Sequence, residues 1–138
     1  MSDLAFTVPG KPLPWKRAGD NRGQRYTPAD QRAYQDRVRW SAIAALGPRR
    51  ARWDSTACFV VELVAYVPDR RRRDVDNFQK QIGDSLNRIL WDDDSQIVMW
   101  KDPRKLLDRA NPRIEVAVWA VPDPMVETLA IIEGEVGR

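Results

Sequence analysis

Aspartates and one lysine recur at short spacing in the middle of the chain. Asp74 and Asp76 alternate, Lys80 follows four residues after Asp76, and a second acid cluster begins at Asp92 and ends at Asp94. Clustered carboxylates repel one another unless a cation lies between them, and a divalent metal bound against a phosphodiester would supply that cation. The spacing therefore predicts a metal-dependent site for phosphate chemistry.

A run of four arginines leads directly into this acidic pattern: Arg70, Arg71, Arg72 and Arg73. The guanidinium group matches a phosphate in a bidentate fork, whereas lysine acts as a point charge. Residues 122–138 carry four acids and one arginine, so the rest of the chain is more basic than the net charge of +3 indicates. We therefore expect a phosphate-binding edge beside the carboxylates and a nucleic acid as the substrate.

The chain contains no histidine. This excludes Ser-His-Asp and Cys-His catalysis, histidine-metal cages and zinc fingers. A metal bound here takes oxygen ligands, which favours Mg²⁺ and leaves Mn²⁺ as an alternative. The general base is then a metal-bound water, a carboxylate or Lys80.

Each of these features also has an ordinary structural explanation. Asp74 in the first turn of a helix is typical of a cap or a partner of the helix dipole. Asp76 and Lys80 have the spacing of a surface ion pair, and the acid cluster fits a solvated turn. Their combination within about 25 residues favours a catalytic site, because together they supply metal ligands, a cation and a phosphate-binding edge.

The elements that must position these residues alternate between strand and helix. Apolar, β-rich runs predict strands over residues 4–8, 57–67, 97–100 and 114–121. Helices are predicted from Thr27-Pro28 to about Leu46 and from Asp74 onward. A basic loop rich in proline and glycine fills residues 9–27. This order predicts an α+β fold, a single mixed layer whose sheet of about four strands is covered by two helices.

Apolar spacing gives each predicted helix one buried stripe. In the first helix the stripe consists of Ala33, Val38, Trp40, Ile43 and Ala44. In the second helix it consists of Phe78, Ile82, Leu86 and Ile89. A basic loop is expected between the last two strands. We expect one folded domain over residues 1–121 and an acidic tail over residues 122–138, which forms either a short helix at 126–132 or an ordered extension.

Two stretches of the sequence together resemble a known family. Residues 68–80 combine the arginine run with an Asp-x-Asp-Asn-x-x-Lys motif, and residues 91–98 place the acid cluster before Ser95-Gln96. This combination closely resembles the RusA family of Holliday-junction resolvases. The order of elements is similar to that of the family over residues 4–121, including an early proline-rich loop with Asn21-Arg22-Gly23.

The resemblance assigns roles to four residues. It implies that the metal-binding carboxylates are Asp74, Asp76 and Asp94 and that the catalytic cation is Lys80. It also implies a homodimeric, magnesium-dependent endonuclease that cuts two opposed strands of a four-way DNA junction in recombination and repair. The family usually has two acids where this chain has three, and counting back from Ser95-Gln96 favours Asp94 over Asp93 as the metal ligand.

The remaining basic side chains are expected to position the DNA backbone without reading its sequence. Beside the four arginines, the predicted DNA contacts are Lys16, Arg17, Arg22, Arg25 and Asn77. Trp15, in the basic loop, is a candidate for stacking on an opened base, although packing is the default role of each tryptophan.

The sequence also bounds the location of the protein and leaves two other functions open. Cys58 is the only cysteine, which fits a reducing cytoplasm, and no apolar run approaches the roughly 18–20 residues of a membrane-crossing helix. We therefore expect a cytoplasmic protein without membrane contact. The alternatives are a nuclease for flaps or other branched DNA with the same metal site, and a non-catalytic protein that binds branched DNA.

Overall fold

The computed structural model describes residues 2–17, 19–21, 24–26, 28–49, 53 and 56–124. Within these residues the strands are β1 (Leu4–Pro9), β2 (Gly19–Asn21), β3 (Gln24–Tyr26), β4 (Cys58–Val67), β5 (Ile97–Leu107) and β6 (Arg113–Val121). The helices are α1 (Ala29–Leu46) and α2 (Val75–Ser85), with short 3₁₀ turns η1 (Gly47–Arg49) and η2 (Asp94–Gln96).

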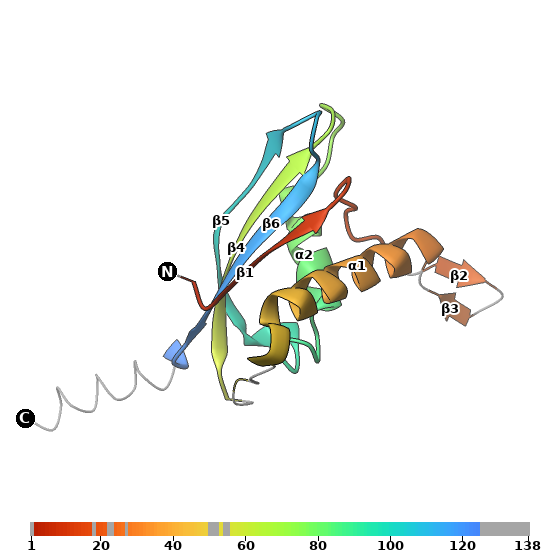
Figure 1. Cartoon of the computed structure of the whole chain (residues 1–138). Helices are drawn as coiled ribbons and strands as arrows, with labels where there is room; N and C mark the ends of the chain where they lie inside the picture. Colours follow the sequence, from red (N-terminus) through yellow and green to blue (C-terminus); the bar gives the residue numbers. More distant parts are fainter. Residues whose placement is uncertain are drawn as a thin grey trace, which may run out of the picture.

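Four strands form one mixed sheet in the order β1-β6-β4-β5 (Figure 1). β6 pairs antiparallel with both β1 and β4, whereas β4 pairs parallel with β5. A parallel pair needs a crossover connection, and α2 supplies it between β4 and β5. The sheet of four strands and the two helices confirm the predicted α+β fold.

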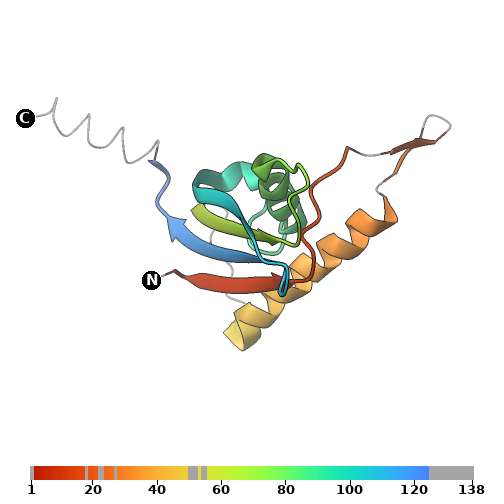
Figure 2. The same ribbon diagram turned by 90° about the horizontal axis from the view of Figure 1, so that it is seen from above.

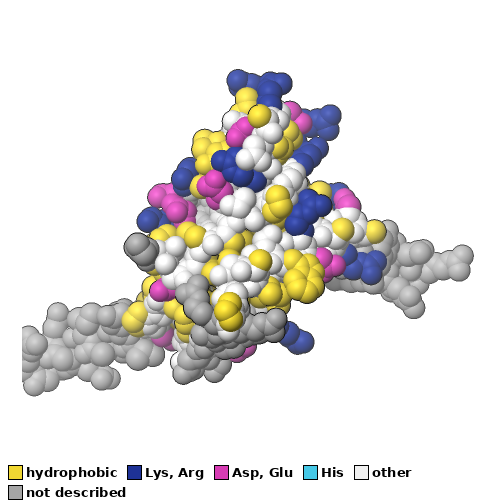
Figure 3. All heavy atoms as spheres, viewed as in Figure 1, with side chains coloured by type: hydrophobic (Ala, Val, Ile, Leu, Met, Phe, Trp, Pro, Cys, Tyr) yellow, Lys and Arg dark blue, Asp and Glu magenta, His cyan; other side chains and the backbone are white. Residues whose placement is uncertain are grey.

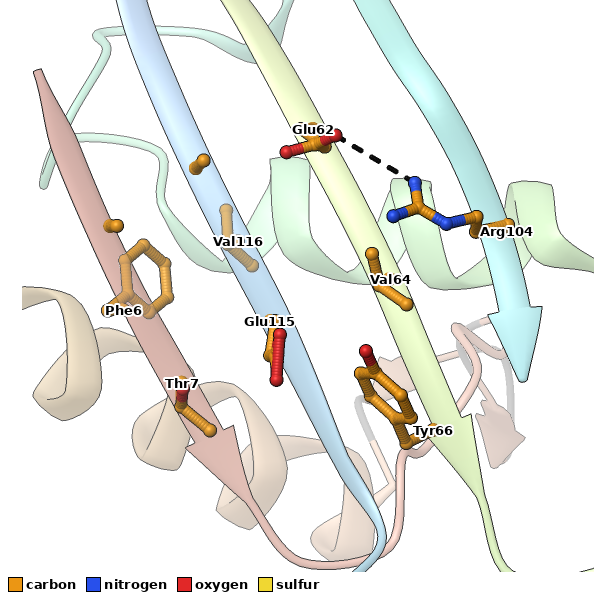
Figure 4. Close-up of a pocket in the computed structure, with 10 residues that line it drawn as sticks. Phe6, Thr7, Glu62, Val64, Tyr66, Arg104, Glu115 and Val116 are labelled. Atoms are coloured by element: carbon orange, nitrogen blue, oxygen red, sulfur yellow. Dashed lines mark ion pairs between the residues drawn. The ribbon is translucent and has the colours of Figure 1, made fainter. Parts of the chain in front are cut away.

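Both helices lie on the same face of the sheet (Figures 1 and 2), and the core lies between the helices and the sheet. Alternate residues of β4, such as Phe59, Val61 and Leu63, are fully buried against this side, where α2 contributes Phe78 and Ile82. Figure 4 shows the opposite face, on which side chains of the intervening β4 positions stand with the helices behind them. There Glu62 pairs with Arg104 at 3.8 Å.

The buried stripe of α1 differs from the prediction. Val38 is buried as expected, but Trp40 is 68% exposed. The buried apolar positions Tyr34, Val38 and Ala42 recur every four residues, which makes one helical face. Two glutamines also lie on this face, and such polar residues are invisible to a pattern based on hydrophobic periodicity.

Strand β5 and helix α2 also have different limits from those predicted. β5 continues through the expected basic loop as far as Leu107, so Lys101, Arg104 and Lys105 are strand residues. Because β5 is an edge strand, such charged side chains can remain in solvent. α2 ends at Ser85, which leaves Ile89 beyond the helix.

Two further predictions concern the early loop and the C-terminal tail. Residues 9–27, predicted to be a loop, include the short antiparallel hairpin of β2 and β3. The helix suggested at residues 126–132 lies outside the described residues. No helix in the described part of the chain combines the length and apolar composition needed to cross a membrane.

Candidate functional site

The first turn of α2 carries most of the predicted chemical groups. Asp74 precedes the helix in an extended conformation, and its backbone carbonyl accepts a hydrogen bond from the Asn77 amide at 3.1 Å. The exposed Asp74 carboxylate makes no capping hydrogen bond. Asp76 and Lys80 lie one turn apart on the same face of the helix. The local sequence thus presents two carboxylates and one ammonium group at the start of α2.

The second acid cluster is a turn held by hydrogen bonds to the Gln96 side chain. The Gln96 side-chain oxygen accepts hydrogen bonds from the amides of Asp92 and Asp93, at 2.7 and 3.1 Å, and its amide nitrogen donates to the Ala57 carbonyl at 2.9 Å. Asp93 acts as the N-cap of η2, because its carboxylate accepts a hydrogen bond from the Ser95 amide at 3.0 Å. These bonds leave the carboxylate of the next residue, Asp94, as the member of the cluster directed at α2.

Asp94 packs beside a glycine of α2. A Cβ atom on Gly83 would lie 3.4 Å from the Asp94 Cβ and 3.6 Å from its Oδ2 atom. A methyl group at position 83 would therefore be in ordinary van der Waals contact with Asp94, and only a bulkier side chain would push against the carboxylate. Trp91 fixes the start of the same turn, since its indole nitrogen donates to the Gly83 carbonyl at 3.0 Å.

One cavity of about 260 Å³ brings these groups together. Its lining residues are Asp76, Gln79, Lys80, Gly83, Asp94, Ile97 and Trp100. Three of the four predicted catalytic residues, from two segments separated by the rest of α2, thus share a single hollow. Asp74 does not line it. No three acidic side chains in the described residues are close enough to hold a metal ion by themselves.

The charge around this cavity favours binding of a cation. Partial burial raises the pKa of Asp94, and the negative charges of Asp93 and Asp84 raise that pKa further, while Lys80 lowers it. The donors are carboxylate oxygens, which suit a hard divalent cation. Because Mg²⁺ is usually held by one or two carboxylates together with water and substrate phosphates, Asp76 and Asp94 fit such an ion without a third protein ligand.

The arginine run divides into two parts. Arg70, Arg71 and Arg72 are exposed. The Arg73 side chain is only 7% exposed and forms an ion pair of 2.8 Å with Asp69. Lys105 also donates a hydrogen bond to the Arg73 carbonyl. Arg73 therefore holds the loop in place, and the surface available to a phosphate consists of the other three arginines.

Basic side chains gather at the end of the sheet where this loop emerges. Figure 3 shows lysine and arginine side chains at the upper end of the molecule, over the carboxyl ends of β4 and β5. The exposed basic residues of this region are Arg70, Arg71, Arg72, Arg104, Lys105 and Arg109. We refer to them as the basic end of the sheet.

The predicted contacts in the early loop are placed less uniformly. Lys16 forms an exposed ion pair of 2.8 Å with Asp30, and Arg17 is exposed. Arg22 lies outside the described residues, and Arg25 belongs to β3 without a described side chain. Asn77 is half-buried, and its carbonyl accepts a hydrogen bond from the Trp15 amide at 3.0 Å.

Sequence reasoning missed the close neighbour of Lys80. The Lys80 Nζ atom lies 3.7 Å from the centre of the Trp15 ring, so one face of the indole is occupied by the ammonium group. The contact between Trp15 and Lys80 joins residues 65 positions apart, so no local motif predicts it. The occupied face also limits the stacking role predicted for Trp15.

An α+β domain with carboxylates and a lysine around one cavity, next to a surface rich in arginine, has the features of a nuclease. Comparison with known proteins agrees with this class. The family model described as endodeoxyribonuclease RusA matches residues 9–119. The chain belongs to the RusA family and is a nuclease, and the family in general implies a divalent metal requirement.

Individual relatives come from bacteria and from a bacteriophage. The crossover junction endodeoxyribonuclease RusA of Escherichia coli (strain K12) is 33% identical over 104 residues, which cover 73% of this chain and 82% of that protein. The protein of the same name from Enterobacteria phage 82 is 32% identical over 105 residues, with the same coverage. The Shigella sonnei (strain Ss046) protein is 30% identical over 105 residues and covers the same shares.

Proposed function

We propose that this chain is a magnesium-dependent endodeoxyribonuclease that resolves four-way DNA junctions by paired phosphodiester hydrolysis. The observation that carries the proposal is the cavity shared by Asp76, Lys80 and Asp94. The crossover junction nucleases to which the chain is similar support the choice of a four-way junction as the substrate. We assign this activity to residues 1–121 and treat residues 122–138 as an appended acidic tail.

The carboxylates would hold the metal and the lysine would act on the phosphate. Asp76 and Asp94 would bind one or two Mg²⁺ ions, with the exposed Asp74 beside them at the start of α2. Such an ion, when bound, lowers the pKa of a water molecule and offsets the charge of the scissile phosphate. Lys80 would stabilise the negative charge that develops on the phosphoryl oxygens, a contribution of a few kcal/mol for groups of this kind.

The basic end of the sheet would position the DNA. The exposed guanidinium groups of Arg70, Arg71 and Arg72 lie a few residues before Asp76 in the chain, so a DNA backbone that they bind can continue toward the cavity. Contacts of this kind carry little sequence information. The four-way geometry, rather than a base sequence, would then select the substrate.

The activity requires two sites, which we propose are supplied by a homodimer. Resolution of a junction needs two opposed cuts, and the family signature occurs once in this chain. A two-fold dimer would place two identical cavities on the two-fold pattern of the junction, and two-fold dimers are the commonest homo-oligomers.

One assay separates the proposed function from its alternatives. The protein is incubated with a synthetic four-way junction, a Y-structure and a linear duplex of the same sequence, each with and without Mg²⁺. We expect paired cuts in the junction only when Mg²⁺ is present. Faster cutting of the Y-structure would favour a flap nuclease, and tight binding without cutting under any condition would favour a binding protein.

The dimer is tested separately by mixing. Sedimentation at micromolar concentration should give about twice the chain mass of 15.9 kDa. Wild-type protein mixed with Asp76→Asn should then form heterodimers that nick one strand without releasing linear duplexes. A monomer that still makes both cuts symmetrically would contradict the proposed assembly.

A further inference from the structure

Lys80 rests on an aromatic ring rather than on a carboxylate. Its Nζ atom lies 3.7 Å from the centre of the Trp15 ring, well within the range of a cation–π contact. The ion pairs of the described residues do not include Lys80, although Asp76 is one helical turn away and Asp94 lines the same cavity. The ammonium group thus stays close to two carboxylates without being paired to either.

Trp15 is held in place from both sides along the backbone. Its own amide donates to the Asn77 carbonyl at 3.0 Å, and the buried Gln81 donates to the Leu13 carbonyl at 3.2 Å. On the other side, Gln31 accepts from the Lys16 amide at 2.6 Å and donates to the Lys16 carbonyl at 3.1 Å. The segment 13–16 is therefore fixed to α1 and α2 by hydrogen bonds that flank the tryptophan.

We propose that Trp15 is a positioning residue that keeps Lys80 at the cavity and away from ion pairs with Asp76 and Asp94. This inference rests on the proposed function, in which Lys80 acts on the phosphate. An unrestrained lysine four residues after an aspartate readily pairs with it. Such a pair would neutralise a carboxylate that the metal needs. The neutral indole attracts the ammonium group through its ring quadrupole and removes no negative charge from the site.

The contact can be observed without metal, DNA or turnover. Protons held over an aromatic face resonate upfield, so the ε-methylene protons of Lys80 should be shifted upfield in the free protein. Their signal is assigned by its disappearance in Lys80→Ala. Trp15→Leu should return it to the position of an ordinary lysine, whereas Trp15→Phe should keep part of the shift. An ordinary lysine shift in the wild-type protein would overturn the inference.

Cleavage kinetics then test whether the contact matters. Trp15→Leu should lower kcat for junction cleavage by about 2- to 30-fold, the range to which the free energy of a cation–π contact converts. It should also raise the Mg²⁺ concentration at half-maximal rate several-fold, because Lys80 now competes for the carboxylates. Trp15→Phe should recover most of both losses. Trp40→Leu, the same change at an exposed position of α1, is the matched control and should cleave like the wild type.

A double-mutant cycle with Lys80→Ala isolates the pairwise effect. If Trp15 acts through Lys80, adding Trp15→Leu to Lys80→Ala should cause no further loss and no further shift in Mg²⁺ dependence. If Lys80→Ala impairs cleavage and Trp15→Leu causes its full loss in addition, the inference about Trp15 would be overturned while the proposed function would stand. Wild-type cleavage by Lys80→Ala would overturn the proposed role of Lys80, and the inference with it. Melting curves confirm that the compared variants are folded.

Discussion

The arginine loop and the carboxylate cavity lie a few residues apart in the sequence. They differ in whether their charged side chains form ion pairs within the protein. In the loop, Arg73 is buried and bonded to Asp69, and this internal pair supports three exposed arginines. In the cavity, Asp76 and Lys80 form no ion pair with any described residue. One ion pair therefore stabilises the conformation of the loop, whereas the charged side chains of the cavity remain available to a bound metal ion or to DNA.

This difference shows which charges belong to the fold and which to the function. A paired charge is satisfied within the protein, so its removal affects stability first. Carboxylates gathered in a partly buried cavity are a sign of a functional site, because the fold alone gains nothing from their repulsion. Substitutions in the two regions should accordingly separate binding, cleavage and stability from one another.

The largest effect is expected from the two carboxylates of the cavity. Asp76→Asn and Asp94→Asn should each reduce the rate of junction cleavage by at least about 100-fold, since each removes a charged ligand next to the reacting phosphate. Junction binding should remain near that of the wild type or tighten slightly, because repulsion of the DNA falls. Single-turnover cleavage and gel-shift titration measure the two quantities.

The acid cluster supplies matched controls for this experiment. Asp92→Asn and Asp93→Asn remove the same charge from the same turn, but neither residue lines the cavity. Asparagine also preserves the capping role of Asp93. Both controls should cleave within about threefold of the wild type. If Asp93→Asn were inactive and Asp94→Asn active, the metal ligand would be Asp93.

A smaller effect, on binding, is expected from the exposed arginines. The double change Arg71→Ala and Arg72→Ala should weaken junction binding and reduce the slope of log affinity against log salt by up to roughly two. Cleavage of fully bound junction should remain close to the wild-type rate. Lys80→Ala should show the reverse pattern, a loss of turnover with little loss of affinity. An unchanged salt slope in the double variant would show that these arginines do not contact phosphate.

The sequence predicts which residues meet at the cavity better than it predicts what surrounds them. Asp76 and Lys80 share a helix face because of their spacing, and the acid turn follows the same helix, so local patterns bring them to one place. The central strand β4 is predicted equally well, because an apolar, β-rich run of that length rarely forms anything but a buried strand. These predictions needed no knowledge of distant partners.

The features that sequence reasoning missed all depend on distant partners. Gln31 and Gln81 are buried because they form hydrogen bonds to the backbone of the early loop. The identity of a polar residue does not reveal such a partner. Trp15 meets Lys80 only once this loop is fixed. Arg73 looks identical to its three neighbours in the sequence, and only its pairing with Asp69 distinguishes it.

The smallest effect is expected from that pair, and it concerns stability. Arg73→Ala should lower Tm at pH 7 by about 5 °C, because the variant loses a buried guanidinium that bonds to Asp69 and to the carbonyls of Asp69 and Arg71. Arg72→Ala, at the adjacent exposed position, should change Tm by no more than about 1 °C. Thermal unfolding of both variants followed by circular dichroism provides the comparison.

Acid should reduce the difference in Tm between these two variants. The hydrogen bond from Arg73, and then that from the Arg71 amide, lowers the pKa of Asp69 to about 2 in the folded protein. The ordinary value is about 3.9. A lowered folded pKa gives stability that is fully present above the ordinary value and is lost as the pH falls toward 2. The Tm gap between Arg73→Ala and Arg72→Ala should therefore be constant from pH 7 to 5 and should narrow clearly by pH 3. A gap that stays constant down to pH 3 would show that Arg73 stabilises the loop by packing and by its hydrogen bonds to backbone carbonyls, and that the charge of Asp69 plays no part.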